Sequence, residues 1–116
     1  MIGNEILIGK TQDTNSNWMA KRITKFGHRV RRITTIGDDL NQISLSLKDI
    51  LQRHPNIIIV CGGLGPTFDD MTNEGIAKGL EREVKLDKDA YESIEKTYQH
   101  AYEQGLLKLK RMTKER

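Results

Sequence analysis

The chain has 116 residues, which is enough for one domain but not for a second independent hydrophobic core. Hydrophobic residues make up 36% and charged residues 30%, a balance typical of a soluble globular domain with a modest core. No apolar run approaches the roughly 20 residues that a membrane span requires, and residues 1–4 lack the features of a secretory signal. We therefore expect a cytoplasmic protein with no membrane partner.

The formal net charge of +3 is unevenly distributed. The last nine residues carry +4, which leaves the preceding part of the chain slightly acidic. A basic tail can bind nucleic acid, but a solvated helix end is the more common explanation. No basic stripe with interleaved aromatic residues appears elsewhere, so nucleic acid is not the expected partner. The basic residues of the tail are Lys108, Lys110, Arg111, Lys114 and Arg116.

Metal-binding spacing is absent from the cysteines and histidines. Cys61 is the only cysteine, which excludes an internal disulfide and argues against a zinc site. His28, His54 and His100 are too far apart in the sequence to form a ligand motif.

The first half of the chain is predicted to alternate between helix and strand. Residues 15–26 have helical spacing of apolar side chains, and either Thr14 or Asn15 could cap the helix. Residues 30–36 are rich in β-branched side chains and predict a strand. A second helix is expected over residues 39–53.

The second half continues this alternation. Residues 56–61 contain an uninterrupted β-branched run, which predicts a strand buried on both faces of a parallel sheet. A glycine-rich loop follows, and helices are expected over residues 72–80 and 88–104. Such alternation indicates a doubly wound α/β sheet, in which ligands bind beyond the carboxyl ends of the strands.

The loop Gly62-Gly63-Leu64-Gly65 lies at such a strand end. Glycines let backbone N–H groups approach an anion, and the helix that follows would favour negative charge. The loop matches neither the P-loop nor the dinucleotide-binding pattern. A phosphate is the natural ligand, although a tight turn that needs glycine only for its geometry would give the same sequence. We expect a β-branched residue at Gly63 to weaken nucleotide binding and to leave the fold largely intact.

Acidic pairs adjoin this loop and the end of the preceding strand. Asp69-Asp70 would repel a phosphate unless a cation lay between them, and Mg²⁺ binds one or two carboxylates together with phosphate oxygens. Asp38-Asp39 should reach the same edge of the sheet. Helix capping by Asp69, Asp70 or Asp39 is the alternative explanation.

Four motifs in order resemble the signatures of the CinA N-terminal domain. This domain belongs to the molybdopterin-binding superfamily, which includes MogA, MoaB and the gephyrin G domain. Any one motif would be weak evidence, but the four together cover nearly the whole chain. The motifs are Ile2-Gly3-Asn4-Glu5-Ile6-Leu7, Asp13-Thr14-Asn15-Ser16, Thr35-Ile36-Gly37-Asp38-Asp39, and Gly62-Gly63-Leu64-Gly65-Pro66-Thr67-x-Asp69-Asp70-x-Thr72.

This resemblance implies a three-layer α/β/α sandwich with a mostly parallel, doubly wound sheet. Family members have a full first strand, where this chain offers only Met1-Ile2, and they continue beyond Arg116. We therefore expect residues 1–116 to be a single domain that is incomplete at both ends, as an excerpt of a longer chain. The resemblance also implies a homo-oligomer.

Activity and site residues are implied by the same resemblance. MogA-type proteins transfer AMP from ATP to molybdopterin, whereas CinA-type domains resemble metal-dependent pyrophosphatases that act on ADP-ribose. The motifs align Asp38 and Asp70 with catalytic aspartates. The divalent metal of CinA-type domains, such as Mg²⁺, agrees with the expectation that Asp69 and Asp70 bind a cation. A non-catalytic module that binds a pterin or nucleotide remains the alternative. The residues expected to bind the phosphate or the rest of the ligand are Gly62, Gly63, Leu64, Gly65, Thr67, Asn4, Glu5, Asp13 and Asn15.

The basic tail gives a first testable prediction. Because the cluster is short and the rest of the chain is slightly acidic, affinity for duplex DNA should be weak and should fall steeply with salt. Fluorescence anisotropy with labelled DNA over a salt series measures this. Tight binding at physiological salt that truncation after Leu107 abolished would contradict the prediction.

Overall fold

The computed structural model describes residues 1–65 and 70–106. Within these ranges the chain forms two compact units. The first contains residues 1–64 and 70–83, and the second contains residue 65 and residues 84–106. Thr67, Asp69 and the basic tail, for which predictions were made from the sequence, lie outside the described residues.

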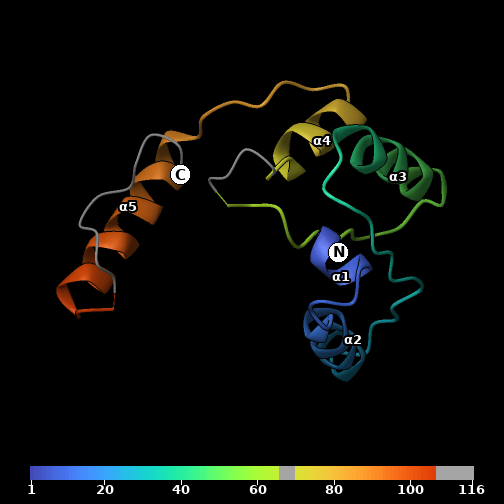
Figure 1. Cartoon of the computed structure of the whole chain (residues 1–116), viewed down its shortest axis with the longest axis horizontal. Helices are drawn as coiled ribbons and strands as arrows, with labels where there is room; N and C mark the ends of the chain where they lie inside the picture. The colour runs from blue at the N-terminus through green and yellow to red at the C-terminus, as the bar shows by residue number, and fades with distance from the viewer. Residues whose placement is uncertain (66–69, 107–116) are drawn as a thin grey trace. The chain divides into compact units, whose positions relative to one another are not determined.

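Four helices lie in the first unit and one in the second (Figure 1). The helices over residues 15–26, 39–53, 72–80 and 88–104 are confirmed, with each end within one residue of its expected position. The short helix at the start of the chain was not predicted, since those residues were expected to form a loop. The helices are α1 (Asn4–Leu7), α2 (Thr14–Lys25), α3 (Leu40–Gln52), α4 (Thr72–Gly79) and α5 (Lys88–Glu103).

Aspartate side chains cap two helices of the first unit. Asp39 accepts a hydrogen bond from Gln42 N at 2.8 Å, as the capping alternative predicted for it. The cap of α2 is Asp13, whose carboxylate accepts from Ser16 N at 2.9 Å. The expected cap at Thr14 or Asn15 is therefore wrong, because the helix begins one residue earlier than its apolar spacing indicated.

The core of the first unit is the contact between α3 and α4, which lie side by side in Figure 1. Ile43 and Leu47 on α3 are buried. They face Gly75 and Gly79, which are four residues apart and so share one face of α4. A Cβ on Gly75 would lie 2.6 Å from Ile43 Cγ2, and one on Gly79 would lie 3.0 Å from Leu47 Cδ2. The absent side chains let the two helices approach closely.

The expected strands are not formed as regular strands in the described part of the chain. Its one β-bridge is parallel and joins Ile2 to Ile36. Burial of residues 57–60 on both faces is also wrong, since Ile57 is 74% exposed and Ile59 51% exposed. The physical reason is that the two segments, residues 30–36 and 56–61, do not pair with each other. In the described part of the chain their backbones bond only to residues 1–3, which lie between them in space. The other backbone groups of these two segments therefore have almost no ladder partner within the residues described.

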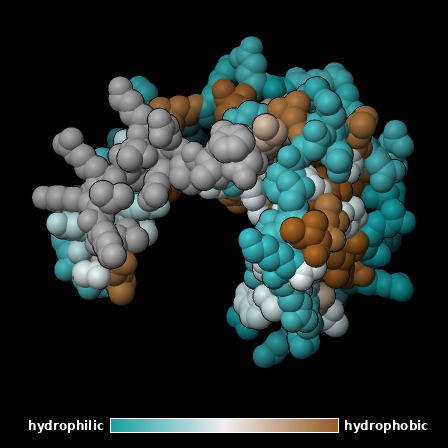
Figure 2. Space-filling view, viewed as in Figure 1, coloured by the Kyte–Doolittle hydropathy of each residue, from teal (hydrophilic) through white to brown (hydrophobic). Residues whose placement is uncertain are grey.

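These two extended segments line an open groove of about 940 Å³ together with apolar side chains of α2 and α3. Figure 2 shows hydrophobic residues gathered at the surface on this side of the first unit. Ile33, Ile57 and Ile59 are among its exposed apolar residues. Of the expected α/β architecture, the described residues thus form the helices and one parallel bridge at Ile2, without a regular sheet.

The helix contact gives a second prediction. Gly75→Ala raises helix propensity by about 1 kcal/mol, but its methyl group overlaps Ile43, and overpacking costs about 1–3 kcal/mol. We expect a net loss in the free energy of unfolding, measured by urea denaturation. Asn73→Ala, at an exposed position of the same helix, serves as the control and should be neutral or slightly stabilising. Equal stability of Gly75→Ala and the wild type would show that the overlap with Ile43 costs no more than the gain in helix propensity.

Candidate functional site

The first three residues align the ends of the two extended segments. Ile2 N donates to Cys61 O at 2.8 Å on one side. On the other side, Gly3 N donates to Ile36 O at 3.0 Å and Ile36 N donates to Met1 O at 3.0 Å. Because the Ile2–Ile36 bridge is parallel, the residues that follow these positions leave in the same direction. Asn4, Asp38 and Gly62 are thereby brought to one edge.

Asn4 and Asp38 hold each other through two hydrogen bonds. Asn4 N donates to Asp38 Oδ2 at 2.8 Å, and Asp38 N donates to Asn4 Oδ1 at 3.2 Å. The second carboxylate oxygen, Oδ1, is turned toward the glycine loop, where a Cβ on Gly63 would lie 3.3 Å from it. The structure thus places the Asp38 carboxylate beside the glycine loop.

The glycines at positions 62 and 63 are required by both backbone conformation and space. Their φ angles are +101° and +59°, in the region that favours glycine. A Cβ on Gly62 would overlap Ile2 O, and one on Gly63 would overlap Thr72 Oγ1. The tight-turn explanation therefore accounts for both glycines by itself. A β-branched residue at Gly63 would also strain the fold, so the expectation of a largely intact fold is wrong.

Thr72 connects the glycine loop to α4. Its Oγ1 donates to Gly62 O at 2.8 Å, its N donates to Gly63 O at 3.4 Å, and the residue is 0% exposed. Within the described residues, the N–H groups of Gly62 and Gly63 donate to no acceptor of the protein. The loop therefore has its carbonyl groups fixed from inside, while these two N–H groups are left to solvent or a ligand.

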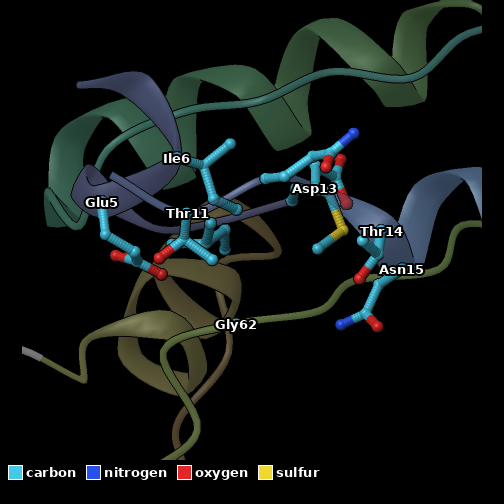
Figure 3. A pocket seen from close by; sticks show the side chains of 10 residues that line it. Glu5, Ile6, Thr11, Asp13, Thr14, Asn15 and Gly62 are labelled. Atoms are coloured by element: carbon cyan, nitrogen blue, oxygen red, sulfur yellow. The ribbon is translucent and has the colours of Figure 1, made fainter. Parts of the chain in front are cut away.

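A small pocket of about 170 Å³ adjoins this edge (Figure 3). Glu5 and Thr11 lie at one side of it and Asp13, Thr14 and Asn15 at the other. The backbone at Gly62 passes along the pocket, so the pocket and the glycine loop are continuous. Three residues proposed from the sequence, Glu5, Asp13 and Asn15, thus meet in one cavity.

Hydrogen bonds from Ser16 favour the ionised form of one of these carboxyl groups, that of Asp13. Bonds from the Ser16 side chain and from its backbone N–H hold the pKa of Asp13 below its ordinary value. The pocket therefore presents a carboxylate at neutral pH. Carboxylate and amide oxygens accept hydrogen bonds from the hydroxyl or amino groups of a ligand.

The remaining candidates are distributed as follows. Leu64 is 62% exposed, and Gly65 belongs to the second unit. Asp70 is half-buried and precedes Thr72 by two residues. Helix α4 has Met71 at its N-cap position, with no capping bond from that side chain. Thr67 and Asp69 lie outside the described residues.

Sequence reasoning missed Thr72 and Thr11 as site residues. Thr72 was placed at the start of a helix and at the end of the fourth motif without a role of its own. A hydroxyl residue after a glycine-rich loop could have indicated a side chain that bonds to the loop. Thr11 lies in a stretch that was expected to be a loop near the ligand, but no role was assigned to this residue itself. No local pattern marks it, because its place in the pocket depends on the unpredicted helix α1.

Residues 1–113 match the family described as "Probable molybdopterin binding domain". A protein of Metallosphaera sedula is 52% identical over 98 residues, which are 84% of this chain and 37% of that protein. A protein of Pyrococcus horikoshii is 42% identical over 106 residues, 91% of this chain and 42% of that protein. The chain thus spans about two fifths of the length of these relatives.

A solved structure is also similar. The crystal structure of the protein CinA, of unknown function, from Thermoplasma acidophilum is 41% identical in sequence, with a TM-score of 0.77. The match covers 84% of this chain and 59% of the other. Among residues 1–65 and 70–106, no helix has the length and apolarity needed to cross a membrane.

The buried threonine gives a third prediction. Thr72→Val keeps the shape of the side chain but leaves Gly62 O without its hydroxyl donor, which should cost about 1–3 kcal/mol of unfolding free energy. Thr72→Ser keeps the hydroxyl group and is the matched control. Denaturant unfolding measures both. If the valine variant is no less stable than the serine variant, the hydroxyl does not support the loop.

Proposed function

We propose that this chain, which belongs to the molybdopterin-binding domain family and to its CinA type, is a metal-dependent pyrophosphatase of a nucleotide such as ADP-ribose. One observation carries the proposal. An Asp38 carboxylate oxygen faces the Gly63 loop, although 25 residues of sequence separate the two positions. A carboxylate beside a loop with available N–H groups suits a ligand that combines phosphate with a cation.

The glycine loop is the proposed phosphate site. The Gly62 and Gly63 N–H groups can donate to phosphate oxygens, while Thr72 holds the loop's carbonyl groups away from the ligand. Helix α4 has eight residues and begins at Thr72, which contacts the loop. The positive end of its dipole would therefore favour a phosphate at the loop. Leu64, Gly65 and Thr67 stay proposed as further ligand-binding residues on the basis of the sequence.

The carboxylates need a cation if they are to coexist with phosphate. Two like unit charges 4 Å apart repel each other by about 4 kcal/mol at an effective dielectric constant near 20. In the described part of the chain no three His, Cys, Asp or Glu side chains form a complete metal cage. We propose Mg²⁺ as this cation, because the ion accepts one or two carboxylates and completes its shell with phosphate oxygens and water.

Asp70 and Asp69 are the proposed metal ligands, and Asp38 is proposed to act with Asp70 on the metal-bound phosphates. When bound, the metal supplies charge neutralisation and polarisation of the phosphoryl group. Asp38 itself would orient the attacking water through the oxygen that faces Gly63. The Gly62 and Gly63 N–H groups would stabilise the charge that develops on the phosphate.

The pocket beside the loop is proposed to hold the rest of the ligand. Glu5, Asp13 and Asn15 offer oxygen acceptors, which fit the hydroxyl groups of a ribose or the amino group of a pterin. Its volume of about 170 Å³ suits one such group rather than a whole dinucleotide. Phosphate would therefore lie at the glycine loop, with the sugar or pterin on the side of Glu5.

A second function stays open because the family description names a pterin. Molybdopterin adenylyltransfer breaks the same kind of phosphoric anhydride bond, and a non-catalytic module would use the same pocket. Turnover of ADP-ribose with Mg²⁺, Mn²⁺ or Co²⁺ identifies the hydrolase, and turnover of ATP only with molybdopterin identifies the transferase. Binding without either reaction identifies the module.

The architecture and assembly that accompany this function are proposals as well. We infer a three-layer α/β/α sandwich around a parallel sheet, which the bridge at Ile2 and the flanking helices support. A homo-oligomer and a cytoplasmic location remain predictions. Analytical ultracentrifugation measures the first.

The two aspartates give the fourth prediction. Asp38→Asn and Asp70→Asn remove charge with little change in shape, so each protein should stay folded while metal-dependent turnover falls by roughly 10²–10³-fold. Asp39→Asn is the matched control. Asp39 is next to Asp38 but caps helix α3, and asparagine caps helices about as well as aspartate. The Asp39→Asn variant should therefore be as active as the wild type.

Thermal melts and steady-state kinetics on purified protein decide this assignment. Full activity in Asp38→Asn and Asp70→Asn would remove both residues from the reaction. Unfolding of both variants would return them to a structural role.

A further inference from the structure

Asn4 makes contacts that a residue serving only to bind a ligand would not need. It opens the four-residue helix α1, and its backbone and side chain both bond to Asp38, which lies 34 residues further along the chain. The side chain also passes close to Gly37, because a Cβ on that glycine would lie 2.5 Å from Asn4 Oδ1. Gly37 therefore leaves the space that the amide of Asn4 occupies.

These contacts fix the orientation of the Asp38 carboxylate. An aspartate side chain otherwise turns broadly about its terminal bond, so that either oxygen can face a ligand. Here the backbone N–H of Asn4 donates to Asp38 Oδ2, and the side-chain amide oxygen of Asn4 accepts from the backbone N–H of Asp38. Oδ1 is left on the side of Gly63.

We propose that Asn4 is a positioning residue, whose amide oxygen fixes the Asp38 backbone so that Asp38 Oδ1 is presented to the metal–phosphate ligand at the glycine loop. This inference rests on the proposed function. It assigns Asn4 a role different from the ligand contact expected from the sequence, because its amide oxygen already accepts a hydrogen bond from Asp38. The effect of Asn4 on the ligand is then indirect.

Substitutions at position 4 separate this role from direct ligand binding. Asn4→Ala keeps the backbone N–H but removes the acceptor for Asp38 N. Asn4→Asp replaces that acceptor with a carboxylate oxygen at the same place. Asn41→Ala is the matched control, since its amide oxygen accepts from Lys78 Nζ at an exposed position of α3.

Two readouts are measured for each protein. The first is kcat and KM for ADP-ribose with Mg²⁺, and the second is the Kd of Mn²⁺ in the presence of ADP, determined by electron paramagnetic resonance. Loss of a residue that orients a metal-site ligand typically reduces activity or metal affinity by about 10–100-fold. We expect Asn4→Ala to show such a fall in kcat with little change in KM. Asn4→Asp should recover most of it, and Asn41→Ala should match the wild type.

Other results overturn the proposal. A rise in KM in both Asn4→Ala and Asn4→Asp, with kcat unchanged, would show that Asn4 contacts the ligand directly. Wild-type kinetics in Asn4→Ala would remove the positioning role and leave the proposed function intact. If Asn4→Ala does not fold, Asn4→Gln takes its place, because its amide lies one methylene further from Asp38 N. The same split between kcat and KM is then required of it.

The two proposals can fail separately. If the wild type turns over no ADP-ribose, the pyrophosphatase proposal fails and the Mn²⁺ measurement decides the role of Asn4. Weaker Mn²⁺ binding in Asn4→Ala that Asn4→Asp restores would support positioning. Equal Mn²⁺ affinity in all variants, or no Mn²⁺ binding at all, would overturn it.

Discussion

The pairing of Ile2 with its neighbours is the interaction on which the candidate site depends. Its backbone bonds to Cys61 on one side, and the parallel bridge joins it to Ile36 on the other. The side chain is 4% exposed, so apolar burial supports the same contact. Asn4, Asp38 and Gly62 follow these three anchored positions by one or two residues. Any shift of Ile2 would therefore move the carboxylate, its partner and the glycine loop relative to one another.

A second requirement is close approach of backbone at the glycine loop. The Ile2 carbonyl lies where a Cβ of Gly62 would be, and the Thr72 hydroxyl lies where a Cβ of Gly63 would be. These contacts explain the glycines without reference to a ligand. They also place available N–H groups next to Asp38, so geometry needed for packing and geometry suited to phosphate coincide. For this reason the glycine pattern alone is weak evidence of function, and the nearby carboxylate carries more weight.

The sequence predicted the helices well because their signals are local. The ranges predicted for α2, α3, α4 and α5 agree with the structure to within one residue at each end. The strands could not be predicted in the same way, since a β-branched run becomes a strand only when a neighbour pairs with it. Ile57 and Ile59 have the composition of a buried strand, yet both are exposed. Whether this segment forms a strand depends on a neighbouring segment that pairs with it, and no local sequence pattern specifies that neighbour.

The candidate site was predictable in part for a related reason. The rule that ligands bind at the carboxyl ends of parallel strands correctly indicated that Asp38 and the glycine loop would lie together. The rule could not show that Asn4 would form hydrogen bonds with Asp38. The two residues are 34 positions apart, and their contact depends on the unpredicted helix α1. Long-range polar pairs of this kind emerge only from the fold.

Charge then determines what the assembled edge can bind. Glu5 and Asp13 line the pocket, Asp38 faces the loop, and Asp70 lies two residues before Thr72. An anionic ligand would meet repulsion from each carboxylate, and the loop's N–H groups alone do not offset several kcal/mol of such repulsion. A ligand that brings its own cation, and whose remaining groups are hydrogen-bond donors, satisfies both the loop and the pocket. Under the proposed function, a metal-bound nucleotide or pterin phosphate would meet this condition.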